Sequence, residues 1–116
     1  VWDKLRESFS SGTTSDEDTL KTIKQVLKDF GELICPHTAV GLAVAYQERK
    51  NIKKSPMITL ATAHPSKFPV AVKRSTGVLP ALPTRYGDLY SRNEVVTQVK
   101  NSLNDIQTII SKRILP

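Results

Sequence analysis

The stretch Thr59–Pro69, TLATAHPSKFP, determines the fold class that the sequence predicts. The apolar run at 57–61 lacks the alternation of a half-exposed strand, so we expect a strand buried on both faces, as in a parallel sheet. A short helix is expected at 65–74, where Pro69 is tolerated only in the first turn. A buried strand that leads through a polar turn into a helix is typical of α/β folds.

The polar residues of this turn are Thr62, His64, Ser66 and Lys67. Open α/β sheets bind ligands at the carboxyl ends of their strands, which is where these side chains would lie. The alternative is structural: Thr62 ends the strand, Ser66 caps the helix, and His64 and Lys67 are solvated. The residues alone leave both interpretations open.

Helical patterns surround the predicted strand. Ser15 can cap a helix at 16–30 whose apolar residues recur at helical spacing, and Gly31 ends this helix. Small apolar residues after Pro36 predict a second helix at 38–50. The remaining predictions are helices at 2–9 and 103–114 and a loop at 78–92, with 94–100 open between strand and helix.

The sequence contains one convincing strand, and that is too few for a stable sheet. Each unpaired buried backbone group costs about 1–3 kcal/mol. Either 94–100 pairs with 57–61, or the other strands belong to sequence outside these 116 residues; we favour the second explanation. The chain begins with Val1 and its single methionine is Met57, which agrees with a piece of a longer protein.

Composition excludes several classes of function. The length predicts one globular unit, and we expect it to be cytoplasmic, without a membrane segment. The net charge is +6, but the basic residues form scattered pairs, which favours a solvated surface over nucleic-acid binding. Cys35, His37 and His64 lack the paired spacing of a zinc site, so we expect no metal. A catalytic pair, with Cys35 as nucleophile and His37 as base, is a weaker interpretation than the metal site. Residues on either side of Pro36 need not face each other.

Two motifs carry a resemblance to a known family. PHTAVGLAVA at 36–45, followed by LATAHPSKF at 60–68, resembles the C-terminal part of threonine synthase. The similarity extends over nearly the whole chain, through FSSGTTSDEDTLKTI and TGVLPALPTRYGDLYSR. The chain departs from the family at Cys35, where aspartate is frequent, and at Val70, where glutamate is frequent.

The resemblance implies a function. Threonine synthase is a pyridoxal-phosphate enzyme of fold type II that converts O-phosphohomoserine and water into threonine and phosphate. The implied fold is α/β, with 1–116 as a single C-terminal segment whose helices surround a strand of an open, mostly parallel sheet completed by absent chain.

The resemblance also assigns residues. Thr62 would face the pyridine nitrogen of pyridoxal phosphate, and His64 and Lys67 would form part of the active-site wall. His37 and Thr38, at a helix N-terminus, would have either a site role or a structural one. The Schiff-base lysine and the glycine-rich phosphate loop are expected in the rest of the polypeptide, so this chain alone would be inactive. A stand-alone basic module that binds nucleic acid or a regulatory partner remains the alternative.

Overall fold

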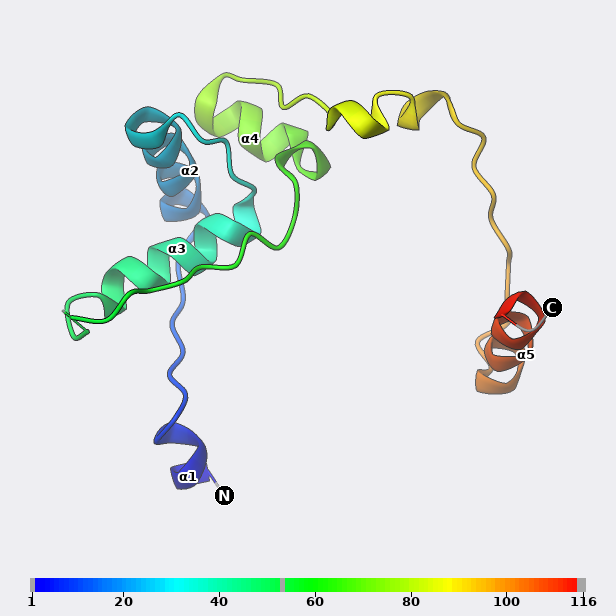
Figure 1. Ribbon diagram of the computed structural model, residues 1–116, viewed down its shortest axis with the longest axis horizontal. Helices are drawn as coiled ribbons and strands as arrows, with labels where there is room; N and C mark the ends of the chain where they lie inside the picture. The colour runs from blue at the N-terminus through cyan, green and yellow to red at the C-terminus, as the bar shows by residue number, and fades with distance from the viewer. Residues whose placement is uncertain (1, 53, 115–116) are drawn as a thin grey trace. The chain divides into compact units, whose positions relative to one another are not determined.

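The computed structural model describes residues 2–52 and 54–114. Within these ranges the chain forms α-helices and short 3₁₀ helices, without a β-strand. It divides into two compact units, Val1–Pro83 and Thr84–Pro116, while the single segment expected for 1–116 in the longer protein stays a prediction. Figure 1 shows the helices of both units in chain order.

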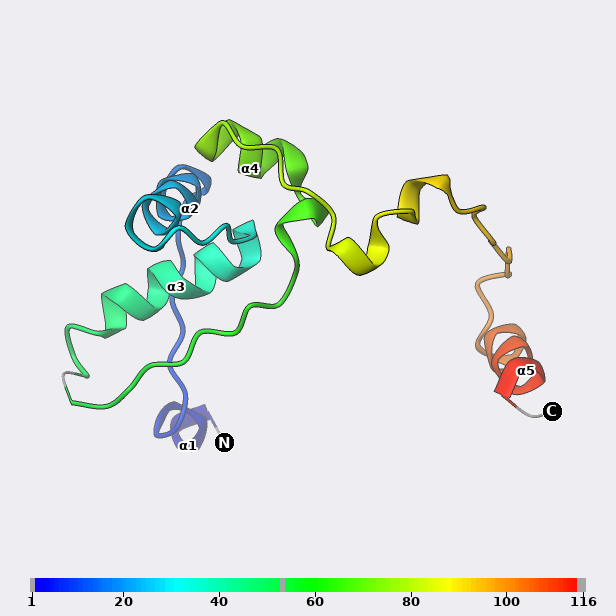
Figure 2. The same cartoon turned by 45° about the horizontal axis from the view of Figure 1, so that its top comes forward.

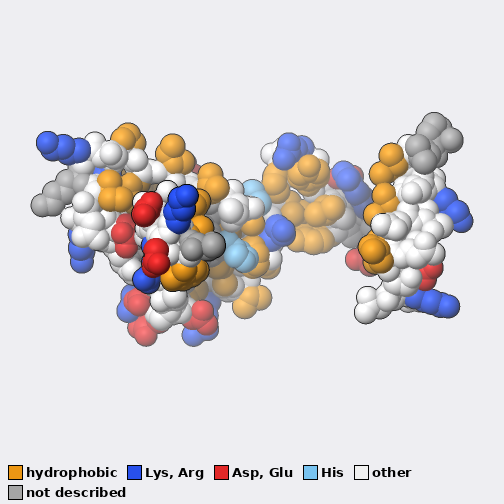
Figure 3. All heavy atoms as spheres, turned by 90° about the horizontal axis from the view of Figure 1, so that it is seen from below, with side chains coloured by type: hydrophobic (Ala, Val, Ile, Leu, Met, Phe, Trp, Pro, Cys, Tyr) orange, Lys and Arg blue, Asp and Glu red, His pale blue; other side chains and the backbone are white. Residues whose placement is uncertain are grey.

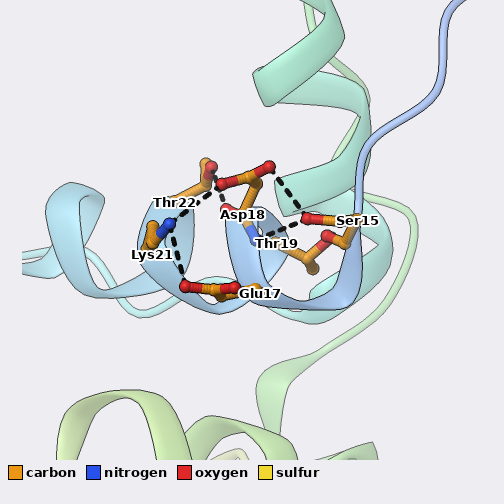
Figure 4. Close-up of polar contacts among 6 residues, drawn as sticks. All are labelled: Ser15, Glu17, Asp18, Thr19, Lys21 and Thr22. Carbon is orange, nitrogen blue, oxygen red and sulfur yellow. Dashed lines mark hydrogen bonds and ion pairs between the residues drawn. The ribbon is translucent and has the colours of Figure 1, made fainter.

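Helix α2, Asp16–Phe30, occupies the residues that the apolar spacing predicts. The hydroxyl of Ser15 accepts a hydrogen bond from the backbone N–H of Asp18 at 3.1 Å and donates to its carboxylate at 2.8 Å. The Nζ atom of Lys21 lies 3.1 Å from Oε1 of Glu17 and 3.2 Å from Oδ1 of Asp18. Figure 4 shows both ion pairs. The hydrogen bonds from Ser15 and Lys21, with the lysine charge, hold the pKa of Asp18 below its usual range.

Proline and glycine set the ends of the next helices. Helix α3, Pro36–Glu48, begins earlier than the predicted 38–50, because a proline in the first turn loses no helical hydrogen bond. The predicted helix at 65–74 is two elements, η1 at Pro65–Lys67 and α4 at Pro69–Thr76. Phe68 separates them with φ −131° and ψ 53°, since a residue before proline avoids the helical region. Gly77, with φ 78°, adopts the left-handed conformation that ends α4.

Helix α2 packs against both α3 and α4, and these contacts form the core of the first unit (Figures 1 and 2). The hydroxyl of Ser75 on α4 donates to the carbonyl of Leu20 on α2 at 2.6 Å, which links the two helices. The buried apolar side chains come from these helices and from the residue before α3; they are Ile23, Val26, Cys35, Ala39 and Val72.

The strand predicted at 57–61 is wrong for the described part of the chain, which forms no strand. The sheet, whose other strands the sequence analysis placed outside these 116 residues, stays a prediction. These residues form an extended segment that runs beside α3 in both views (Figures 1 and 2). The side chains of Ile58 and Leu60 are 88% and 73% exposed, so this segment is not buried on both faces. A strand needs edge partners for its backbone groups, and the described residues supply none.

The extended segment lies close to α3 at Gly41. A Cβ atom at this glycine would lie 3.3 Å from Cγ2 of Thr59, tighter than ordinary van der Waals contact. The missing side chain therefore allows the close approach of the segment to the helix.

The other elements also differ in part from the prediction. Helix α1, Trp2–Arg6, ends earlier than the predicted 2–9. In the second unit, α5 occupies Leu103–Ile114, as its spacing predicts. The expected loop contains the 3₁₀ helices η2, Thr84–Tyr86, and η3, Leu89–Ser91, while 94–100 forms neither helix nor strand.

Apolar side chains remain at the surface of both units, as the space-filling view in Figure 3 shows. Val70 on α4 is 81% exposed, and Val95 in the second unit is 84% exposed. Helix α5 buries no residue at all. Among the described helices none has the length and apolarity needed to cross a membrane.

These exposed side chains lead to a prediction about the isolated chain. Exposed apolar side chains favour association, so we expect the isolated 116-residue chain either to self-associate or to have a low melting temperature. Analytical ultracentrifugation and thermal unfolding, each at several protein concentrations, measure both properties. A monomer whose cooperative unfolding is independent of concentration would contradict the prediction.

Candidate functional site

Thr62 follows the extended segment and lies at a groove beside α3. This groove has a volume of about 370 Å³ and is lined by His37 and Gly41 from α3 and by Thr62 itself. Both Thr62 and His37 are exposed. The structure therefore brings residues of both sequence motifs to the same groove, among them the Thr62 hydroxyl and the His37 imidazole. Glu48, at the last residue of α3, also lines it.

His64 caps the short helix η1. Its Nδ1 atom accepts a hydrogen bond from the backbone N–H of Ser66 at 3.2 Å, and the Ser66 hydroxyl lies 2.7 Å from the same nitrogen. The backbone N–H of Lys67 donates to the carbonyl of His64 at 3.1 Å, which closes the turn. Ser66 is buried, whereas the histidine is exposed. The imidazole is thus held from one side and open on the other.

Lys67 faces a different space from Thr62. It lines a pocket of about 490 Å³ with Asp16 and Leu20 of α2 and with Arg74 of α4. The winding of η1 explains the separation, because successive residues of a 3₁₀ helix project in directions about a third of a turn apart. The turn that carries four polar residues therefore does not direct them all to one place.

His37 and Thr38 are neighbours in sequence but differ in their surroundings. The ring of His37 lies against the ring of Phe68, with centroids 4.7 Å apart and planes at 58°. Thr38 is buried, and its hydroxyl lies 3.2 Å from Sγ of Cys35. His37 is open to a ligand, whereas Thr38 is enclosed by protein.

Cys35 is the N-cap residue of α3, a role that the sequence analysis did not assign to it. Its Sγ atom accepts from the backbone N–H of Thr38 at 3.4 Å, and the side chain has no exposed surface. Burial alone raises the pKa of the thiol, but the Thr38 hydroxyl and the backbone groups of Thr38, His37 and Ala63 together hold it below its ordinary value. Its position directly before Pro36 was the available signal, since proline favours the first helical turn.

The backbone of Ala63, between Thr62 and His64, is one of the groups that lower the pKa of Cys35. The turn that carries both candidate residues therefore lies near the start of α3. The described residues contain no cluster of three or more side chains suited to a metal ion. As an acceptor enclosed in a helix cap, the thiol fixes positions within the site.

Comparison with known proteins identifies the family. The family model described as "Threonine synthase, C-terminal" matches residues 38–110. The chain belongs to the threonine synthase family. Threonine synthase of Pseudomonas aeruginosa is 43% identical over 112 residues, which cover 96% of this chain and 24% of that protein. Threonine synthase of Corynebacterium glutamicum is 32% identical over 102 residues, covering 88% of this chain and 21% of that protein.

A solved structure extends the similarity to three dimensions. The PLP-bound threonine synthase from Brucella melitensis matches with a TM-score of 0.71 and 37% identity, covering 98% of this chain and 24% of that one. The chain thus spans about a quarter of the length of the threonine synthases that it matches. The resemblance predicted from the two motifs is confirmed.

The cap at Cys35 gives a prediction about α3. Cys35→Ala leaves the buried Thr38 N–H without its acceptor and the Thr38 hydroxyl without its partner, at a cost of about 1–3 kcal/mol. We expect amide exchange at Thr38 to accelerate by roughly five- to a hundredfold, since exchange follows the local opening equilibrium. Hydrogen exchange with mass spectrometry of the α3 peptide measures this change.

Cys35→Ser is the matched control, because serine is a preferred N-cap residue and keeps an acceptor in place. The serine variant should exchange close to the wild-type rate. If the alanine and serine variants exchange equally, the thiol does not hold the helix start.

Proposed function

We propose that this chain is the C-terminal part of a threonine synthase that converts O-phospho-L-homoserine and water into L-threonine and phosphate. The observation that carries this proposal is the 43% identity to the Pseudomonas aeruginosa enzyme over nearly the whole chain. We call the longer polypeptide proposed to contain these residues the intact synthase.

The basic residues do not favour the alternative of a nucleic-acid or regulatory module. Lys73-Arg74 lies in the last turn of α4, and Lys112-Arg113 lies in the last turn of α5. Positive side chains at these ends interact favourably with the helix dipole, which accounts for them structurally. The third pair, Lys53-Lys54, includes a residue outside the described ranges.

Pyridoxal phosphate, which the Brucella melitensis enzyme binds, fits the residues at the Thr62 groove. A hydroxyl can donate to an unprotonated pyridine nitrogen, and the exposed Thr62 offers one at a groove of about 370 Å³. When bound, the cofactor supplies the electron sink for chemistry next to the substrate amino group. Thr62 would orient the ring.

The imidazoles of His37 and His64 would act at the same site, although His64 is not among the residues that line the groove. His37 lines the groove, and the contact of its ring with Phe68 restricts its orientation. His64 is two residues from Thr62 and has one open side, from which it can reach a bound anion. We propose that both residues exclude water and contact the substrate.

Thr38 and Lys67 have surroundings that support other roles. Thr38 is enclosed with Cys35, which supports a structural role at the start of α3. Lys67 lines the pocket between α2 and α4, so its charge would act on the substrate only from outside the groove of Thr62. The lysine that attaches the cofactor and the loop that binds its phosphate would come from the remaining three quarters of the enzyme.

Attachment of the cofactor supplies one prediction. Borohydride reduction of the intact synthase with pyridoxal phosphate should modify one lysine stoichiometrically, and peptide mass mapping should locate it outside residues 1–116. Lys67→Ala should retain the same modified peptide, which serves as the control. A stoichiometric label on a lysine of this chain would contradict the assignment.

Thr62 supplies a second prediction. In the intact synthase, Thr62→Val keeps the side-chain shape but leaves the pyridine nitrogen of the bound cofactor without a hydrogen-bond donor. Such an unpaired buried acceptor costs about 1–3 kcal/mol. We expect turnover to fall on the order of ten- to a hundredfold, because each 1.4 kcal/mol is about tenfold in rate. Phosphate and threonine release from O-phosphohomoserine measure turnover and test the proposed function directly in the wild type.

Two further variants control this experiment. Thr62→Ser restores the hydroxyl and should recover much of the activity. Thr22→Val makes the same change on the exposed face of α2, where the hydroxyl only contacts the helix backbone, and should have wild-type turnover. A Thr62→Val enzyme with normal turnover and an unchanged cofactor absorption spectrum would exclude contact between Thr62 and the ring.

A further inference from the structure

The hydrogen bonds around His64 determine which nitrogen of its ring carries the proton. A backbone N–H can only donate, so the contact of 3.2 Å between Ser66 N and His64 Nδ1 requires an unprotonated Nδ1. The Ser66 hydroxyl, 2.7 Å from the same nitrogen, must then donate as well. With Nδ1 accepting both bonds, the ring proton is on Nε2.

The arrangement is held by buried structure. Ser66 is 8% exposed, and the peptide between it and His64 contains Pro65, which restricts the backbone. The carbonyl of His64 accepts from Lys67 N, so both the backbone and the ring are fixed. The Nε2–H group of this exposed side chain is therefore a preorganised hydrogen-bond donor.

We propose that His64 donates a hydrogen bond through Nε2–H to an anionic group of the substrate, and that Ser66 is the positioning residue that selects this tautomer. The inference rests on the proposed function, whose substrate carries a carboxylate and a phosphate ester. With Nδ1 occupied by the bonds from Ser66, the ring presents its Nε2–H to the anion.

Two substitutions of His64 separate a donor from a helix cap. In His64→Gln, the amide nitrogen reaches close to the former Nε2 position and keeps a donor there. In His64→Asn, the shorter side chain keeps an acceptor near the Nδ1 position, as a preferred cap residue does, but cannot reach the substrate. We expect kcat/KM of the intact synthase to fall on the order of ten- to a hundredfold in His64→Asn. His64→Gln should retain most of it.

The tautomer itself is measured without reference to activity. In the intact synthase labelled with ¹⁵N-histidine, the signals of His64 are identified by their loss in His64→Gln. Their nitrogen shifts should show a protonated Nε2 and an unprotonated Nδ1. Ser66→Ala removes one of the two bonds to Nδ1 and should raise the share of the other tautomer, whereas Ser66→Thr should restore the wild-type spectrum. Ser111→Ala, on α5, is the control that should leave the spectrum unchanged.

The outcomes separate this inference from the function on which it rests. A wild-type synthase that releases no threonine would contradict the proposed function, and the tautomer measurement would still test the role of Ser66. With an active wild type, the donor role is overturned if His64→Asn is as active as the wild type, or if His64→Gln loses as much as His64→Asn. A protonated Nδ1 would overturn the role of Ser66.

Discussion

The start of α3 depends on the thiol of Cys35, the buried N-cap residue whose Sγ atom accepts a hydrogen bond from the backbone N–H of Thr38. It satisfies the Thr38 N–H that the first turn of a helix leaves without a partner, and it interacts with the backbone at Ala63. Thr62 and His64 flank Ala63. The backbone between the two candidate residues therefore lies near the cap of α3.

This arrangement also explains how the chain tolerates a departure from its family. Aspartate is a common N-cap residue because its carboxylate accepts from the backbone of the first turn. The thiol of Cys35 also accepts from a backbone N–H of the first turn. The hydrogen bonds directed at the thiol lower its pKa.

Local signals predicted the helices well and the strand badly. Helix α2 was predictable because Ser15, the acidic first turn and Gly31 all act within the helix or next to it. The strand was not, since an apolar run at 57–61 does not reveal whether hydrogen-bond partners exist, and in the described chain it stays extended with Ile58 exposed. The two motifs were sufficient to predict the family, but they did not show that η1 turns Lys67 away from the groove of Thr62. The cap at Cys35 was missed because cysteine is uncommon at that position.

The close approach at Gly41 has a consequence for how this family can vary. A Cβ atom there would lie 3.3 Å from Cγ2 of Thr59, three residues before Thr62, and the Thr59 side chain or its backbone would have to give by a few tenths of an ångström. If the backbone gave way, a displacement of that size would be enough to lengthen a hydrogen bond from a hydroxyl to a ring nitrogen. The space at residue 41 is thus linked to the position of Thr62 through Thr59.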